Sequence, residues 1–343
     1  MAGSKQVRIV YVVGAGLSAG LTFPTTGDLL PKMWDRVEAA DLSNDLADVI
    51  RFHHPNFNPA LLKSYPDIEQ LLSEMEANAK LFDSSRPATG NFTSEDLEER
   101  RKSLLLVLAK WFHEQQATAL QRPLDWLLEL IDKLKAEKAQ VISFNWDLVL
   151  DELLFGDRLR KSSYGLGKHD LGPRLIKPHG SLNWYEQSTG KHLKEEKRFS
   201  LGGKGSSEVF AFKAYREPKS TRRRYMPLIV PPVYMKEFNG DLFRRLWQET
   251  VSVLSTAGEV KFLGYSLPAS DFPARFILRC GFHNQEFGEL QKGGGRAPAT
   301  GRAKVTIVDP GTDGPMRVKE AVGWECDWQQ KTIANWIQSG GLS

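Results

Sequence analysis

The chain has 343 residues, which is enough for two average domains or for one large α/β domain with insertions. Hydrophobic residues make up 41% of it, so a sizeable core can be buried. Its 46 basic residues nearly balance its 42 acidic ones, and the resulting net charge of +4 does not by itself predict nucleic-acid binding. Two cysteines, Cys280 and Cys326, exclude a zinc site built from CxxC pairs and disfavour a disulfide framework, so we expect inert buried thiols in a reducing cytoplasm.

The first predicted element is a buried strand, Val7–Val13, that breaks directly into a glycine turn over Gly14–Ser18. With about seven apolar residues, this run is too short to span a membrane, and it lacks a signal-peptide cleavage pattern. Because glycine has no Cβ, such a turn lets the backbone approach a ligand, and we expect it to bind a nucleotide phosphate. A GxGxxG fingerprint would have its third glycine at position 19, but Ala19 stands there and Gly20 follows, unlike an ordinary dehydrogenase. The alternative is a plain strand-to-helix turn.

Short apolar runs predict the other strands of a sheet. With the first strand, the predicted set is Val7–Val13, Val141–Phe144, Leu175–Lys177, Leu228–Val230, Val260–Leu263 and Lys304–Val308. Continuous runs of this kind suit a parallel sheet that is covered on both faces. Apolar spacings of three and four predict helices over Leu61–Leu81, Ser103–Phe112, Leu124–Leu134 and Leu242–Leu254. Strands that alternate with helices indicate an α/β fold with a Rossmann-like, doubly wound parallel sheet.

The first two predicted strands are about 125 residues apart, far more than one crossover helix needs. We therefore expect residues 1–29 and 139–343 to form the nucleotide-binding core and 30–138 to form a helical insertion, with a polar loop at Asp83–Thr93. Residues 187–225 are rich in Lys, Arg, Gly and Ser, which predicts a basic irregular hairpin within the core.

A basic cluster within that hairpin leaves nucleic-acid binding open. It consists of Arg222, Arg223 and Arg224, with Arg216 and Lys219 nearby. A solvated hairpin or a contact between subunits is the alternative interpretation of such a charge cluster.

Polar or glycine-containing patches follow most of the predicted strands directly. They are Gly14–Ser18, Ser143–Asp147, Lys177–Trp184, Gly264–Pro268 and Asp309–Gly311. Open α/β sheets bind ligands at the carboxyl ends of their strands, so these patches would ring one crevice with glycine backbone, an Asn, a His and carboxylates.

In their order and spacing, these patches resemble the Sir2 group, which comprises the sirtuins and the Sir2-like NAD hydrolases. The resemblance runs from Gly14–Ser18 through Asn145-x-Asp147 and His179-Gly180 to Gly264–Ser266 and the strand that ends at Asp309, and it covers most of the chain. The sequence KPHGSLNW at 177–184 is most similar to Sir2-like proteins of bacterial anti-phage defence, and Asp67-Ile68-Glu69 has a similar character.

The departures from the deacetylases are specific. The chain lacks the cysteines for their four-cysteine zinc module, so the resemblance implies a sirtuin-like fold without that module and no metal site. Their Gln-Asn-Ile-Asp motif is Phe-Asn-Trp-Asp here, at 144–147, and Phe23–Gly27 replaces the Phe-Arg pair that follows their glycine turn.

The resemblance implies an enzyme, an NAD glycohydrolase that converts NAD and water to ADP-ribose and nicotinamide. It further implies that NAD is the substrate, that the protein is the NAD-depleting effector of an anti-phage system, and that it self-assembles. Partners implied in the same way are an ATPase-helicase, an Argonaute-type protein or another defence protein. The alternative functions are an NAD-dependent protein deacylase, and a non-catalytic module that senses NAD or ADP-ribose.

The chemistry of NAD cleavage assigns a role to each predicted site residue. Nicotinamide is a cationic leaving group on an anomeric carbon, and cleavage passes through an oxocarbenium-like state. Asn145 can hold the ribose hydroxyls or orient water, and His179 can act as general base on a ribose hydroxyl or on water. Asp147 would bind the nicotinamide carboxamide or stabilise positive charge, and Ser266 and Asp309 would lie at the adenosine half. The full set of predicted NAD-contacting residues besides Asn145 and His179 is Gly14, Ala15, Gly16, Ser18, Thr25, Asp147, Gly180, Gly264, Ser266 and Asp309.

Each assignment has a structural alternative. Asn145 could be the N-cap of a helix over Asp147–Leu154, and His179 could be a structural histidine. Acids such as Asp147 also favour the first turn of a helix, and Ser266 and Asp309 could be cap or turn residues. Thr25, Thr26 and Asp28 could contact the ribose or simply open the next helix.

Overall fold

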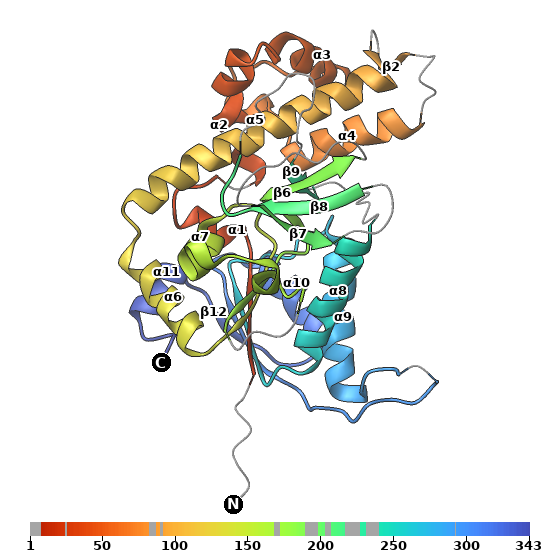
Figure 1. Cartoon of the computed structure of the whole chain (residues 1–343). Coiled ribbons are helices and arrows are strands. Elements are labelled where there is room, and N and C mark those ends of the chain that lie inside the picture. The colour runs from red at the N-terminus through yellow and green to blue at the C-terminus, as the bar shows by residue number, and fades with distance from the viewer. Residues whose placement is uncertain are drawn as a thin grey trace, which may run out of the picture.

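In a computed structural model of the chain, the described residues are 8–24, 26–81, 87–89, 92–167, 172–188, 198–202, 207–216, 227–230, 240–291 and 293–343. A parallel sheet packed between helices and a smaller antiparallel sheet make up most of the described part of the molecule (Figure 1). Among the described residues, no helix combines the length and the apolar character that crossing a membrane would need.

Six parallel strands form the central sheet in the order β12-β11-β10-β1-β4-β5. Their bounds are β1 Ile9–Val13, β4 Gln140–Ser143, β5 Arg174–Ile176, β10 Glu259–Leu263, β11 Lys304–Val308 and β12 Asp327–Gln329. The chain moves outward from β1 through β4 to β5 and then returns to β10 on the other side of β1. This is the order of a Rossmann sheet, with its switch point between β1 and β10, so the predicted doubly wound fold is confirmed.

Alternate residues of β1 belong to two different hydrophobic clusters. Tyr11 and Val13 pack in one, with residues of α6 (Asp125–Ala136) and α11 (Ile333–Gln338), while Val10 and Val12 pack in the other. The second cluster includes residues of α8 (Asp241–Ser255), α9 (Phe272–Phe287) and α10 (Asp313–Val322). Helices therefore cover both faces of the sheet, which accounts for strands that are continuously apolar instead of alternating.

The interval between β1 and β4 is largely helical; that it forms an insertion with the proposed boundaries stays a prediction. Its elements are α1 Ala15–Ala19, α2 Thr26–Ala39, α3 Ser43–His53, η1 Leu62–Ser64, α4 Ile68–Leu81, β2 Pro87–Thr89, β3 Phe92–Thr93, α5 Ser94–Gln121 and α6. In Figure 1, α2 to α5 lie above the two sheets. The part of the loop predicted at Asp83–Thr93 that the structure describes forms the small β2–β3 pair.

The helix predicted over Leu61–Leu81 begins later than expected, at Ile68. Pro66 disfavours helical backbone at the residue before it, and Tyr65 is extended, with φ −71° and ψ 130°. Leu61 and Leu62 lie before this break and are exposed. The predicted helix over Ser103–Phe112 is the middle of the longer α5, which begins at a capping box between Thr93 and Asp96.

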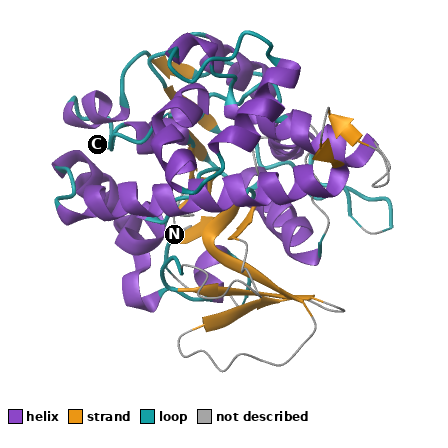
Figure 2. Cartoon of the chain, turned by 90° about the horizontal axis from the view of Figure 1, so that it is seen from above, coloured by secondary structure: helices purple, strands orange, loops and turns teal. Residues whose placement is uncertain are grey.

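The second sheet corrects two expectations. It is antiparallel, in the order β7-β8-β6-β9, with β6 Gly180–Ser188, β7 Arg198–Gly202, β8 Ser207–Phe212 and β9 Pro227–Ile229. The run Leu228–Val230 therefore contributes to this sheet and not to the parallel one, because three apolar residues do not specify a pairing partner. Figure 2 shows this sheet at one side of the helix-rich body.

The predicted irregular hairpin at 187–225 is likewise strand in much of its described part. In β8, Val209 and Ala211 pack with the cluster of α8 and α9, while Phe210 and Phe212 pack with Tyr185 on the other face. This alternation is typical of a strand with two buried faces. Arg222–Arg224 and Lys219 lie outside the described residues.

The remaining elements are α7 Val149–Phe155, η2 Gly156–Arg158 and η3 Lys161–Tyr164. Cys280 is half-buried and Cys326 is buried. Burial raises the pKa of Cys280 and raises that of Cys326 to about 11, so both thiols are protonated near neutral pH.

The turns after β1 and β10 pack backbone against backbone. A Cβ on Gly16 would lie 2.6 Å from the Cα of Gly264, and a Cβ on Gly264 would lie 2.6 Å from the Cα of Gly16. Gly264 also has a φ of +60°. Gly14 is equally close to its neighbour, because a Cβ there would lie 2.6 Å from the Cα of Tyr265. The glycines of the first motif are therefore required by the fold itself.

We expect Gly264→Ala to lower the free energy of unfolding by at least about 2 kcal/mol, because a methyl group at this position meets backbone and opposes a positive φ. Urea denaturation followed by circular dichroism measures this change. Gly295→Ala is the matched control, since its new methyl group would meet nothing within 4 Å, and we expect a change below about 1 kcal/mol. Equal effects of the two substitutions would contradict the backbone packing described above.

Candidate active site

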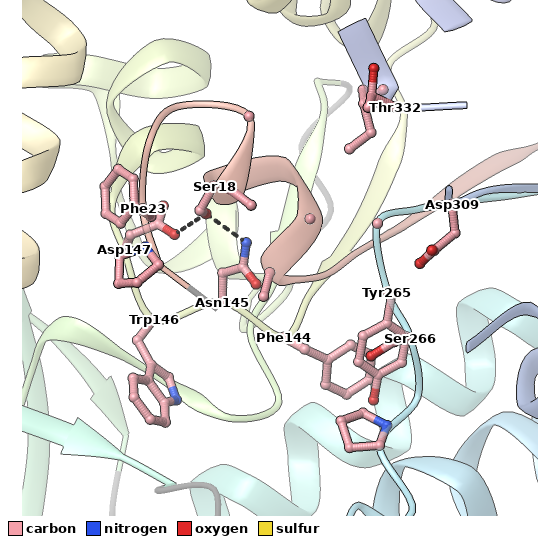
Figure 3. Close-up of a pocket in the computed structure, with 18 of the residues that line it drawn as sticks. Ser18, Phe23, Phe144, Asn145, Trp146, Asp147, Tyr265, Ser266, Asp309 and Thr332 are labelled. Carbon is pink, nitrogen blue, oxygen red and sulfur yellow. Dashed lines mark hydrogen bonds between the residues drawn. The ribbon is translucent and has the colours of Figure 1, made fainter. Parts of the chain in front are cut away.

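A pocket of about 610 Å³ lies at the carboxyl ends of β1, β4, β10 and β11. Its volume is within the range of small-molecule sites, about 300–1,000 Å³. Figure 3 shows Ser18, Asn145, Ser266 and Asp309, which come from separate segments of the chain, around one space. The predicted site residues that line it are Ala15, Gly16, Ser18, Asn145, Asp147, His179, Gly264, Ser266 and Asp309.

Other predicted residues do not line this pocket or are not described. Gly14 lies beneath Tyr265. Gly180, with φ +81°, packs so closely on β9 that a Cβ would lie 2.0 Å from the Leu228 carbonyl oxygen. Asp28 is exposed and pairs with Lys32 at 3.7 Å. Thr25 and the side chain of Thr26 lie outside the described part of the chain.

Two amides of the glycine turn are already used within the protein. The Gly14 amide donates to the Leu263 carbonyl oxygen at 3.2 Å, and the Gly16 amide donates to the Gly264 carbonyl oxygen at 2.8 Å. The backbone that is exposed toward the pocket is that of Ala15 and Gly16. The turn therefore presents a surface to a ligand, while these two hydrogen bonds serve the packing of β1 on β10.

Asn145 belongs to a chain of hydrogen bonds that ends at Asp147 (Figure 3). Its Nδ2 donates to the Gly14 carbonyl oxygen at 2.9 Å and to Ser18 Oγ at 3.0 Å, and Ser18 Oγ donates to Asp147 Oδ2 at 2.6 Å. Because its nitrogen is committed to these bonds, the side-chain carbonyl oxygen is the atom that Asn145 can present to a ligand. The N-cap alternative is wrong, since the helix begins at Val149 with Leu148 in the cap position.

Asp147 is buried, and its contacts are mainly within the protein. Its Oδ1 accepts from the Val149 amide at 3.1 Å, in addition to the bond from Ser18. Burial raises the pKa of this carboxyl group, while the positive charge of Lys177 and the Ser18 hydrogen bond act in the opposite direction. The carboxylate fixes Ser18, which in turn holds Asn145.

Lys177, directly after β5, connects the segment of His179 to the segment of Asn145. Its Nζ donates to the carbonyl oxygens of Trp146, at 3.3 Å, and Asp147, at 2.6 Å. It also donates to Ser181 Oγ at 2.7 Å and pairs with Asp151 Oδ2 at 3.0 Å, and both charged side chains are 1% exposed. The hydrogen bonds to Trp146 and Asp147 fix the loop that carries Asn145, and Asp151 compensates the buried charge of the lysine. The sequence analysis singles out the segment 177–184 but does not predict that Lys177 holds the neighbouring loop. A lysine directly after a buried strand is the feature of the sequence that could have indicated it.

His179 is 7% exposed and sits among aromatic rings. Its ring centroid lies 4.9 Å from that of Phe144 and 5.9 Å from that of Trp247, and Phe144 in turn stacks on Tyr265 at 4.2 Å with an interplanar angle of 6°. The Val230 amide donates to the His179 carbonyl oxygen at 2.8 Å, so β9 fixes the backbone here.

Two acidic residues of the pocket were not in the predicted site. Asp271, 2% exposed, lies in the loop after β10, and its Oδ2 is 3.2 Å from Nε2 of His179. Glu69, near the start of α4, accepts a hydrogen bond from the Ser270 hydroxyl group. In the sequence, Glu69 stands out only as part of Asp67-Ile68-Glu69, and Asp271 follows the GYSLP patch by a few residues without a motif of its own.

Asp309 and Ser266 lie on the other side of the pocket from Asn145 (Figure 3). Oδ1 of Asp309 accepts from the Gly311 amide at 2.8 Å, a turn contact, while burial raises the pKa of its carboxyl group. Within the described ranges, no group of three or more His, Cys, Asp or Glu side chains is arranged to hold a metal ion.

No protein-family model matches the chain, and no curated protein matches it in sequence. Solved structures of Sir2 homologues are similar to it. A Sir2 homolog–NAD complex has a TM-score of 0.47 and 12% identity, covering 98% of this chain and 91% of that one. Sir2Tm bound to a propionylated peptide has a TM-score of 0.42 and 14% identity, covering 98% and 94%. A mutant Sir2 homologue with ADP-ribose has a TM-score of 0.45 and 11% identity, covering 97% and 89%. The fold assignment rests on the strand order and register of the central sheet.

We expect Lys177→Met to lower the free energy of unfolding by about 3–5 kcal/mol, because it leaves Asp151 as an uncompensated buried charge. Adding Asp151→Asn should recover part of this loss, so that the double variant is more stable than the sum of the single effects predicts. Chemical denaturation of the four proteins measures the coupling. Lys213→Met is the control, since its pair with Asp157 is exposed and should contribute no more than about 1 kcal/mol. A Lys177 effect no larger than the control would contradict this assignment.

Proposed function

We propose that this chain is an NAD hydrolase, which converts NAD and water to ADP-ribose and nicotinamide. The observation that carries the proposal is that Asn145 and His179, from loops after two different strands, line the same pocket at the switch point of a Rossmann sheet. An amide that can hold a ribose hydroxyl or a water, and an imidazole that can accept a proton, suit cleavage at the nicotinamide ribose. The resemblance of the sequence motifs to the Sir2-like NAD hydrolases points to the same substrate.

The proposed reaction breaks the bond between C1′ of the ribose and the nicotinamide nitrogen. The electron pair of that bond goes to the nitrogen, which neutralises the ring, and positive charge develops on the ribose. Asn145 holds the ribose or the attacking water through its side-chain carbonyl oxygen. His179 takes the proton that the water loses as its oxygen bonds to C1′.

The charge of the pocket fits this assignment. Glu69 places a carboxyl group in its wall, and Asp147 accepts a hydrogen bond from Ser18, which itself accepts one from Asn145. Carboxylates near the reacting ribose favour the cationic nicotinamide ring and the positive charge of the transition state. The diphosphate would then lie along the exposed backbone of Ala15 and Gly16, and the adenosine half near Ser266 and Asp309.

The resemblance also supports a wider role. We propose a self-assembling, NAD-depleting effector of anti-phage defence that is controlled by its assembly or by a partner protein. The helices α2 to α5 are the proposed contact surface, because Glu69 at the start of α4 reaches the pocket itself.

We expect the purified protein, alone or with its genomic neighbour's product, to release nicotinamide from NAD, which chromatography of the products measures. His179→Ala and Asn145→Ala should each lower the rate by about 10²-fold or more, since each removes a group that acts on the reacting ribose or water. His283→Ala, an exposed histidine on α9, is the matched control and should leave the rate unchanged.

Two other outcomes would overturn the proposal. NAD loss only when an acyl-lysine peptide is present would indicate a deacylase. Tight binding of NAD without turnover in every assembly state would indicate a sensing module.

A further inference from the structure

His179 and Asp271 both line the pocket and contact each other. Nε2 of the imidazole lies 3.2 Å from Oδ2 of the carboxylate, and the two side chains are 9% and 3% exposed. At this separation and burial, a carboxylate stabilises a positively charged imidazole much more strongly than it would in water. Such contacts often tighten only when substrate is bound.

Asp271 is itself held firmly from two directions. Its Oδ1 accepts from the Ala274 amide at 3.3 Å and so caps the N-terminus of α9, and its Oδ2 accepts from the Tyr265 hydroxyl group at 3.1 Å. Burial and the nearby Asp271 charge raise the pKa of Tyr265 well above its usual value, so the tyrosine stays a hydrogen-bond donor. A carboxylate fixed in this way can orient a neighbouring ring.

We infer that Asp271 is the positioning residue for His179 in the proposed NAD hydrolysis. It orients the imidazole that takes the proton of the attacking water. The inference rests on the proposed function. In this arrangement Nε2 faces the carboxylate of Asp271, and the imidazole takes the proton that the water loses. The water oxygen bonds to C1′ as the C1′–nitrogen bond breaks, and Asp271 stabilises the imidazolium that results.

The electrostatic surroundings of the pair include other ionisable groups. Tyr265 contacts Asp271 directly, and Glu69 and Arg275 both act on Tyr265 through their charges. On the other side of His179 are the neutral rings of Phe144 and Trp247. Among the groups named here, Asp271 is the carboxylate in ion-pair contact with the imidazole, so its removal should change the titration of His179 most.

The test is Asp271→Asn, which keeps the size of the side chain and an acceptor for the helix cap. We expect kcat to fall by about 10²-fold or more with little change in KM, because ordering of the base is lost and substrate contacts stay. The acid limb of the pH–rate profile should move down by about one pH unit or more, since the imidazolium loses its partner. Glu320→Gln is the matched control: it removes a carboxylate from an exposed pair with Arg279 of α9 and should leave both readouts unchanged.

A double variant separates a positioning role from an independent one. If Asp271 acts through His179, then Asp271→Asn should cause no further loss of activity in a His179→Ala background. A further loss, or a single variant with the wild-type rate and pH profile, would overturn the inference.

One measurement does not depend on NAD turnover. NMR titration of the imidazole resonances, assigned with His179→Ala, should show the half-protonation pH of His179 falling in Asp271→Asn. An unchanged midpoint overturns the pairing even if the protein hydrolyses NAD. Absence of turnover with a shifted midpoint overturns the proposed function and leaves the pairing intact.

Discussion

The contact between Gly16 and Gly264 is the constraint on which the rest of the site depends. Because each glycine would bring a Cβ within 2.6 Å of the other's Cα, the turns after β1 and β10 can approach only without side chains. That approach puts Tyr265 over Gly14, where its ring stacks on Phe144, and Phe144 in turn packs against His179. Backbone packing at the switch point thus sets the position of His179, the candidate base, through the rings of Tyr265 and Phe144.

Lys177, which directly follows β5, supplies the second constraint. A buried ion pair adds little net stability compared with apolar packing, so what Lys177 contributes to the site is the position of the groups it bonds. Here the ammonium group binds the main chain of Trp146 and Asp147 as well as Asp151. The loop of Asn145 and the loop of His179 are therefore fixed to one another through a single side chain.

The sequence predicts those parts of the molecule that are local. Each strand of the parallel sheet except β12 could be located, because continuous apolar runs of this length, bounded by turn residues, are typical of buried strands. Residues of the polar patches at the strand ends line one pocket, as the sequence predicts. The antiparallel sheet was missed because β9 is three residues long and the basic flanks of β8 hide its alternation. Asp271 and Glu69 were missed because their importance comes only from contacts with residues far away in sequence.

The chemistry proposed for the pocket explains why its acidic groups and its glycine turn occur together. NAD carries a positive charge on nicotinamide and negative charges on its diphosphate, and ADP-ribose keeps only the latter. In the proposed reaction, a carboxylate such as Glu69 therefore attracts the substrate at its reacting end and ceases to attract it once nicotinamide has left. A pocket that held NAD as a redox cofactor would gain nothing from this asymmetry, whereas one that consumes NAD gains both transition-state stabilisation and easier release of the product.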